Sequence, residues 1–221
     1  MKKQIFTIAL IAMFFSPLFW RGAGGEVFAQ SPNYLWAKSA GGTSSDWGKS
    51  VATDASGNVF VCGVFESLSI TFGSYTLTNA SASSGDIFLV KYDASGNVIW
   101  AKSAGGTDDD YGYSVATDAS GNTFVTGRFH SPSITFGSYT LTNASAGSGD
   151  IFLVKYDASG NVIWAKSTGG TTEDKSSSVA TDARGNCFVT GGFWSSSITF
   201  GSYTLNNASA GKGDIFLAKF K

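Results

Sequence analysis

The sequence has little of what several classes of protein require. Its 221 residues include one histidine, two cysteines and three prolines, and the net charge is −1. This balance gives no basic surface of the kind that binds nucleic acid. The lone histidine, His130, has no recognisable nucleophile and orienting acid beside it in the sequence, so no catalytic triad is predicted. No motif predicts a cofactor, and no amphipathic helical stripe occurs beyond residue 20.

The single long apolar run lies at the N-terminus and predicts export. Lys2 and Lys3 precede the apolar stretch Ile5–Trp20, and Val27 and Ala29 occupy the −3 and −1 positions of a cleavage site. We therefore expect residues 1–29 to be a cleaved signal peptide. The alternative is an uncleaved anchor, although a run of about 16 residues is short for a bilayer, which needs roughly 20. Cleavage would leave a secreted, periplasmic or cell-surface protein without a membrane span.

The two cysteines occupy different positions of a repeat described below. Cys62 aligns with Thr126 and Thr190, whereas Cys187 aligns with Val59 and Thr123. The two positions differ by three residues within a strand, so the side chains should face opposite ways. Two buried free thiols are expected, and a disulfide between them stays open because export allows it.

A repeat of 64 residues organises the rest of the chain. The stretch DASGNVIWAKSAGG at 93–106 returns at 157–170 with one change, and its tail appears alone at 36–42. Trp36, Trp100 and Trp164 are consequently 64 residues apart, and the copies span 36–99, 100–163 and 164–221. Copies one and two differ at only ten of 64 positions. Such a period predicts one supersecondary unit, stacked repeatedly.

Each copy predicts four main antiparallel strands, and hence an all-β fold. In copy one these are 49–53, 58–65, 86–92 and 98–103, with a small hairpin inside 66–85, and an extra strand of the fourth type is expected at 34–39. The segment DIFLVKY is apolar on both faces, so both faces must be covered by neighbouring sheets. We expect Trp100 to fill the gap between sheets. The Asp-x-x-Gly-Asn segments predict Asx-type hairpin turns, headed by Asp54, Asp93, Asp118, Asp157 and Asp182.

The repeat resembles the bacterial β-propeller repeat family called SBBP. The resemblance rests on Asp118–Asn122 leading into Phe124–Gly127, and on a second group that recurs in register: Asp150, Phe152, Lys155, Asp157, Gly160, Asn161, Trp164, Gly169 and Gly170. It covers residues 34–221. It implies propeller blades of four antiparallel strands in an exported or surface protein, and it supplies no shared catalytic residues.

Three blades are fewer than the four to eight of typical propellers. Three outcomes therefore stay open. The chain could be part of a longer array, two chains could form a homodimeric six-bladed ring, or the repeats could close as a three-fold β-trefoil or β-prism. In a ring, the strand at 34–39 would complete the blade that ends at 214–220.

One edge of the blades is the predicted binding surface. Strand parity places both DASGN turns of each copy at one edge, and the GGT loop and the long insert at the other. Differences among the copies concentrate at the second edge, as expected of a recognition surface on a rigid scaffold. Neutral drift of a solvated edge is the alternative. The candidate residues are Trp47, Glu66, Tyr111, Tyr113, Arg128, His130 and Trp194.

No metal site is predicted with any strength. Each DASGN turn has one carboxylate where calcium needs several oxygen ligands. The run Asp108, Asp109 and Asp110 is a weak calcium candidate, although a solvated loop is favoured because copies one and three carry different residues there.

These features together predict an exported, non-enzymatic binding or structural scaffold whose partner is a protein or glycan at the cell envelope. The alternative is a carbohydrate-active hydrolase or lyase that uses a central propeller channel. Its acids and bases would lie on the first strands, which read KSVAT, YSVAT and SSVAT at 49–53, 113–117 and 177–181.

Overall fold

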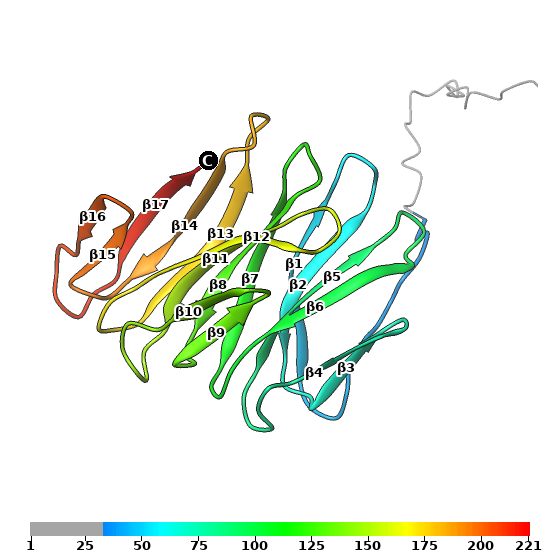
Figure 1. The fold of residues 1–221 in the computed structure, drawn as a ribbon, viewed down its shortest axis with the longest axis horizontal. Coiled ribbons are helices and arrows are strands. Elements are labelled where there is room, and N and C mark those ends of the chain that lie inside the picture. Colours follow the sequence, from blue (N-terminus) through cyan, green and yellow to red (C-terminus); the bar gives the residue numbers. More distant parts are fainter. Residues whose placement is uncertain (1–32) are drawn as a thin grey trace, which may run out of the picture. The chain divides into compact units, whose positions relative to one another are not determined.

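A computed structural model describes residues 33–221, so the predicted signal peptide lies outside the described residues. Within this range all regular structure is β, and no helix is long and apolar enough to cross a membrane. Residues 36–221 form one compact unit, and we call its three larger sheets blades 1, 2 and 3 (Figure 1).

Blades 1 and 2 each have four antiparallel strands, and blade 3 has three among the described residues. Blade 1 consists of β1 (Asp46–Thr53), β2 (Val59–Phe65), β5 (Asp86–Tyr92) and β6 (Val98–Ala104). Blade 2 consists of β7 (Asp110–Thr117), β8 (Thr123–Phe129), β11 (Asp150–Tyr156) and β12 (Val162–Thr168). Blade 3 consists of β13 (Asp174–Thr181), β14 (Cys187–Phe193) and β17 (Asp214–Phe220). The prediction of repeated propeller-type blades is confirmed.

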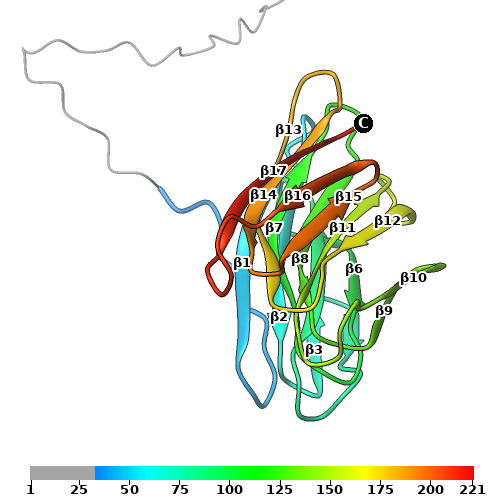
Figure 2. The ribbon, with the colours of Figure 1, turned by 90° about the vertical axis from the view of Figure 1, so that its left-hand side faces the viewer.

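A two-stranded hairpin follows the second strand of each blade. These hairpins are β3 (Ser69–Phe72) with β4 (Tyr75–Thr78), β9 (Ser133–Phe136) with β10 (Tyr139–Thr142), and β15 (Ser197–Phe200) with β16 (Tyr203–Asn206). In Figure 2 the first strands β1, β7 and β13 lie towards one side, and hairpin β9–β10 lies on the opposite side.

Two strand predictions need correction. The expected strand at 34–39 is absent. The fourth strand of a blade pairs with the third, as β6 does with β5, and among residues 33–221 no third strand of a blade precedes residues 34–39. The first strand of blade 1 begins at Asp46 rather than residue 49, since a β-bulge between Gly48 and Ser50 lets the ladder with β2 continue past the irregularity.

The sheets pack face to face, which explains why DIFLVKY is apolar on both faces. Apolar side chains of blades 1 and 2 share one core, including Leu89 from blade 1 and Val115 and Phe152 from blade 2. Blades 2 and 3 share a second core that includes Leu153 and Phe216. The middle blade is thus covered on both faces, as its sequence requires.

Trp100 fills the gap between blades 1 and 2, as predicted. Its ring packs edge-on against Phe60 with centroids 6.0 Å apart, and its indole N–H donates to the carbonyl oxygen of Ala158 at 3.3 Å. Ala158 belongs to the β11–β12 turn of blade 2, so this side chain joins two blades.

The DASGN turns share one hydrogen-bond pattern. In Asp93–Asn97, one carboxylate oxygen of Asp93 accepts from the backbone N–H of Ser95 and Asn97, and the other accepts from the Asn97 side-chain amide. Gly96 has φ of 79°, the left-handed conformation that glycine tolerates best. The Asn97 backbone and side-chain donors hold the pKa of Asp93 below its usual range. Asp54, Asp118, Asp157 and Asp182 make the same contacts.

Both cysteines are free and buried. Cys62 lies in the core between blades 1 and 2, and Cys187 lies in the core between blades 2 and 3. Burial raises the pKa of the Cys62 thiol to about 12, so it stays an unreactive thiol at neutral pH.

The blades do not close into a ring. Val51 on β1 is 64% exposed and Leu217 on β17 is 72% exposed, whereas their equivalents Val115 and Leu89 are 5% and 2% exposed. The two end faces of the row are therefore open. The closed three-fold alternatives, a β-trefoil or a β-prism, are wrong because the sheets follow one another face to face (Figure 1).

Candidate binding site at the variable edge

We call the edge that carries the GGT loops and the inserts the variable edge, and the edge with the DASGN turns the turn edge. The strand order β1-β2-β5-β6 is antiparallel throughout, so both DASGN turns of a blade lie at the same edge. Eight of the ten differences between copies one and two fall in the variable edge's loops or the adjoining halves of strands. In copy one these positions are Ser44, Ser45, Trp47, Lys49, Val64, Glu66, Leu68 and Ser83.

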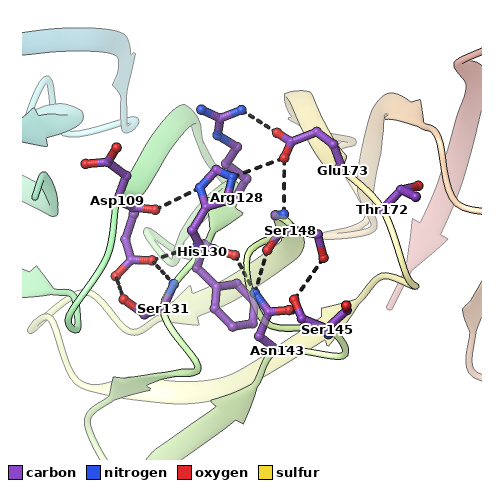
Figure 3. A network of polar contacts seen from close by, with 12 residues as sticks. Asp109, Arg128, His130, Ser131, Asn143, Ser145, Ser148, Thr172 and Glu173 are labelled. Atoms are coloured by element: carbon purple, nitrogen blue, oxygen red, sulfur yellow. Dashed lines mark hydrogen bonds and ion pairs between the residues drawn. The ribbon is translucent and has the colours of Figure 1, made fainter.

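A charged cluster joins blades 2 and 3 at this edge (Figure 3). Glu173, in the loop before β13, forms an ion pair with Arg128 of β8 and accepts a hydrogen bond from the backbone N–H of Gly149. The His130 ring nitrogen Nε2 lies 3.1 Å from a Glu173 carboxylate oxygen, and its Nδ1 lies 3.1 Å from the carbonyl oxygen of Asp109. Both ring nitrogens of His130 therefore face protein oxygens.

The electrostatics of Glu173 follow from these neighbours. Partial burial favours its neutral form, but the Arg128 guanidinium and His130 outweigh burial and hold the pKa of Glu173 below its usual range. At neutral pH the cluster therefore contains an ionised carboxylate beside a guanidinium. Since the charged atoms are only partly buried, the cluster is an ordered but accessible polar feature.

Two tyrosine rings lie against the Arg128 guanidinium. Tyr111 and Tyr113 on β7 are stacked, with centroids 6.0 Å apart and an interplanar angle of 5°. The Arg128 guanidinium carbon lies 5.1 Å from the Tyr111 ring centroid, within the range of a cation–π contact. Burial raises the pKa of both phenols, so they stay neutral and planar platforms for the guanidinium at physiological pH.

The other two blades carry their own pairs of a cation and an aromatic ring. In blade 1, Lys49 Nζ lies 5.1 Å from the Trp47 ring centroid. In blade 3, Lys175 Nζ lies 5.4 Å from the Trp194 ring centroid. Every blade thus presents an aromatic–cation pair at the variable edge: blades 1 and 3 pair lysine with tryptophan at different positions, and blade 2 pairs arginine with tyrosine.

The structure brings some predicted residues together and separates others. Arg128, His130, Tyr111 and Tyr113 form one cluster, whereas the pairs centred on Trp47 and Trp194 belong to the neighbouring blades. Glu66 follows β2, and its backbone N–H donates to the carbonyl oxygen of Ser45. Its side chain has no ion pair among residues 33–221.

Sequence reasoning missed Glu173, which is the centre of the charged cluster. Its signal was weak: position 173 aligns with Asp109 and Ser45, so only two copies carry an acid there. Asp109 plays the matching part between blades 1 and 2, where it accepts from the backbone N–H of Gly85 at 2.9 Å.

The three carboxylates of the weak calcium candidate, Asp108–Asp110, each contact a different partner. Asp110 is buried and accepts from the Ser131 hydroxyl at 2.8 Å, while Asp109 bonds to Gly85. The Asp108 side chain accepts a hydrogen bond from the Thr107 hydroxyl and from no other group among residues 33–221. Within the described part of the chain, no three acidic, histidine or cysteine side chains are arranged to share a metal ion.

Buried carboxyls near the blade junctions make stability depend on pH. Burial raises the pKa of Asp86 and Asp150 to about 6, from an ordinary value of 3.8. Burial, with Asp86 as a lesser contributor, raises the pKa of Asp110 to about 6. A raised pKa in the folded state means stability that is complete below pH 3.8 and is lost as pH rises to about 6.

We therefore expect the chain to resist urea better at pH 5.0 than at pH 7.5. A shift of two units corresponds to an upper bound of about 3 kcal/mol per carboxyl over the whole titration, and about half of it falls between pH 5.0 and 7.5. Solvent screening reduces that half to about 0.5 kcal/mol per carboxyl. The double variant Asp86→Asn/Asp150→Asn should lose most of this pH dependence. An unfolding midpoint that is equal at both pH values, or lower at pH 5.0, would contradict the assignment.

The chain is similar to segments of two longer proteins. No family model matches it. It is 30% identical over 171 residues to the regulatory protein FlaEY of Caulobacter vibrioides, covering 76% of this chain and 17% of the relative. It is 28% identical over 193 residues to an uncharacterised WD repeat-containing protein, L264, of Acanthamoeba polyphaga mimivirus, covering 75% of this chain and 14% of the relative. The chain thus spans about one sixth of the length of these curated relatives.

A search of solved structures finds a crystal structure of a protein of unknown function from Bacteroides caccae. It is 12% identical, the match covers 76% of this chain and 61% of that chain, and the TM-score is 0.27. A TM-score this low has no bearing on the fold or the function.

Proposed function

We propose that this chain is an exported, non-enzymatic scaffold of propeller-type blades whose variable edge binds a protein partner at the cell surface or outside the cell. The observation that carries the proposal is the contrast between the two edges of one repeated scaffold. The turn edge keeps the same DASGN design, while the variable edge carries eight of the ten differences between the first two copies. Residues that vary on a constant framework are typical of recognition surfaces.

The chemistry of the variable edge favours a protein partner. Tyrosine, tryptophan and arginine are the side chains most enriched at the energetic centres of protein interfaces. The cluster of Tyr111, Tyr113 and Arg128 is held in place by stacking and by the ion pair to Glu173. Side chains that are ordered before binding lose little conformational entropy when a partner arrives.

Two further points support a non-enzymatic scaffold. One relative is called a regulatory protein and the other a WD repeat-containing protein, and WD repeats are four-stranded propeller blades. His130, the single histidine, faces Glu173 and a backbone carbonyl and therefore lacks the serine or cysteine partner of a hydrolytic triad. Export rests on the composition of residues 1–29.

The binding prediction compares two sets of substitutions. Replacing Trp47, Tyr111 and Trp194 together with serine should lower capture of the envelope partner at least about tenfold, as expected when several interface anchors are lost. The matched control is Ile99→Ser/Ile163→Ser, which removes side chains that are 40% and 42% exposed from the fourth strands. Capture would be quantified from the source organism's surface proteins, with a glycan array run in parallel.

The outcomes separate the candidate functions. Loss of capture in the triple variant but not in the control supports the variable edge as the binding site. Equal capture by both variants would place the site elsewhere. Binding on the glycan array that the triple variant abolishes would replace the protein partner with a carbohydrate. Hydrolase or lyase turnover that depends on His130 or on Asp108–Asp110 would overturn the non-enzymatic function.

A further inference from the structure

Blade 3 has an open slot where blades 1 and 2 have their fourth strand. Strand β6 pairs with β5, and β12 pairs with β11, but β17 has no partner on that side among residues 33–221. A groove of about 770 Å³ lies along β17, beside hairpin β15–β16 and near β12. Its apolar lining includes Phe200, Tyr203, Leu217 and Phe220.

Apolar side chains on the outer face of blade 3, beside this slot, are exposed although their equivalents in the other blades are covered. Ile215 and Leu217 are 87% and 72% exposed. The matching residues of blade 2, Ile151 and Leu153, are 2% and 3% exposed because blade 3 covers them. Blade 3 therefore presents the same surface that blades 1 and 2 use to bind the next blade.

Individual groups of the hairpin also lack the neighbours that their equivalents have. The Tyr75 hydroxyl donates to the carbonyl oxygen of Ile99 at 2.6 Å, and Tyr139 donates to that of Ile163 at 2.7 Å. These acceptors belong to fourth strands. Tyr203 occupies the same position in blade 3, is 76% exposed and has no such acceptor among the described residues.

The chain itself carries a strand of the missing type. Residues 34–40 read YLWAKSA, and the fourth strand β6 reads VIWAKSA at 98–104. Residues 34–40 are not in a strand, and Tyr34 and Leu35 are exposed. In the register of β6 with β5, Lys38 would lie opposite Leu217 and Trp36 opposite Lys219.

Trp36 indicates which blade this segment borders. Its indole N–H donates to the carbonyl oxygen of Ala94 in blade 1 at 3.2 Å, as Trp100 donates to Ala158 of the blade after its own. Trp36 thus already occupies the position of a fourth-strand tryptophan whose own blade would lie in front of blade 1.

The first strands repeat the same contact between neighbouring blades, and the groups for one more such contact are present at the two ends of the row. The Thr117 hydroxyl donates to the carbonyl oxygen of Thr53, and the Thr181 hydroxyl donates to that of Thr117. Across a further junction, the Thr53 hydroxyl would donate to the carbonyl oxygen of Thr181. Val51, on the open face of blade 1, would then be covered as Val115 is.

We propose that residues 34–40 of one copy of this chain form the fourth strand of blade 3 in a second copy, so that blade 3 packs on blade 1 of the neighbour. The contact is head-to-tail, and its surfaces are those that already join the blades within one chain. Head-to-tail contacts make a closed ring when the rotation allows. Two chains of three blades give six, within the range of propellers.

Cross-linking tests the strand exchange and its direction. One chain carries Lys38→Cys and another carries Leu217→Cys, so only contact between copies can join them. We expect the oxidised mixture to form a covalent species of twice the protomer mass. The register control, Lys38→Cys mixed with Ile215→Cys, should give at least tenfold less, and the parent chain with its two buried cysteines should give none.

Protomer mass is read first by mass spectrometry, so that any N-terminal processing is accounted for, and light scattering then gives the assembly. Leu217→Ser, at an exposed position, should keep the thermal transition of a folded chain yet shift the mass towards one protomer. A mixture that forms no cross-link overturns the proposal, as does a doubly substituted chain that links only within itself. A ladder of longer species would keep strand exchange but refute the two-chain ring.

Discussion

Replacing Gly127 with alanine is expected to lower the free energy of unfolding by more than about 3 kcal/mol, in the range of the most disruptive core substitutions. Gly127 lies in β8, at the centre of the middle blade. A Cβ atom at this position would lie 1.8 Å from the carbonyl oxygen of Tyr111 and 2.7 Å from an edge carbon of Phe152. Neither neighbour can move freely, because one is backbone and the other is a fully buried ring.

The close approach has a local cause. The ladder between β7 and β8 is irregular between Gly112 and Ser114, and this bulge directs the Tyr111 carbonyl towards Gly127. Gly63 in blade 1 and Gly191 in blade 3 face the same crowding from Trp47 and Lys175. Glycine is therefore required at this position in each blade, because the bulge that places the aromatic–cation pair at the variable edge leaves no room for a Cβ atom.

Urea unfolding monitored by circular dichroism measures this effect. The control is Gly48→Ala, on the strand that pairs with the equivalent of β8, where the added Cβ would lie 3.6 Å from a Val61 methyl group in ordinary contact. We expect Gly48→Ala to shift the unfolding free energy by less than about 1 kcal/mol. Unfolding of Gly127→Ala and Gly48→Ala at the same urea concentration would contradict the close contact of a Cβ atom at Gly127 with the Tyr111 carbonyl oxygen and the Phe152 ring.

The repeat made most of the fold predictable. A strand that is apolar on both faces requires a neighbour on each side, and a tryptophan every 64 residues predicts the same junction each time. The structure bears this out at Trp100, which joins the β6 side of blade 1 to a turn of blade 2. Strand parity likewise placed the DASGN turns and the loops at opposite edges, because parity follows from antiparallel order alone.

Features that depend on a neighbour outside the copy were not predictable. Residues 34–39 have the sequence of a strand but lack a partner among residues 33–221, and a strand needs both. The ion pair of Arg128 with Glu173 joins residues of different blades that vary independently, so no pattern within one copy indicates it. The bulges were hidden as well, since alternation of apolar residues does not show where a ladder shifts register.

The second large effect is expected at Trp100. Trp100→Ala should lower the free energy of unfolding by about 3–5 kcal/mol, the usual cost of removing a buried large aromatic side chain. The side chain is 7% exposed, packs against Phe60 and donates a hydrogen bond across the junction to Ala158. Its loss would leave a cavity between blades 1 and 2 and would remove the donor to that carbonyl.

The repeat supplies a matched control in Trp36→Ala. Trp36 makes the same indole hydrogen bond to the equivalent residue, Ala94, but it is 38% exposed and borders one blade only. Its removal should lower the free energy of unfolding by about 1–2 kcal/mol, in proportion to the smaller apolar area that it buries.

Both variants are compared by urea unfolding at a protein concentration where light scattering gives the mass of one protomer. Trp100→Phe should fall between Trp100→Ala and the parent chain, because it keeps the ring packing and loses the indole donor. Equal losses for Trp100→Ala and Trp36→Ala would mean that the hydrogen bond, and not burial between two blades, sets the contribution of this tryptophan to stability.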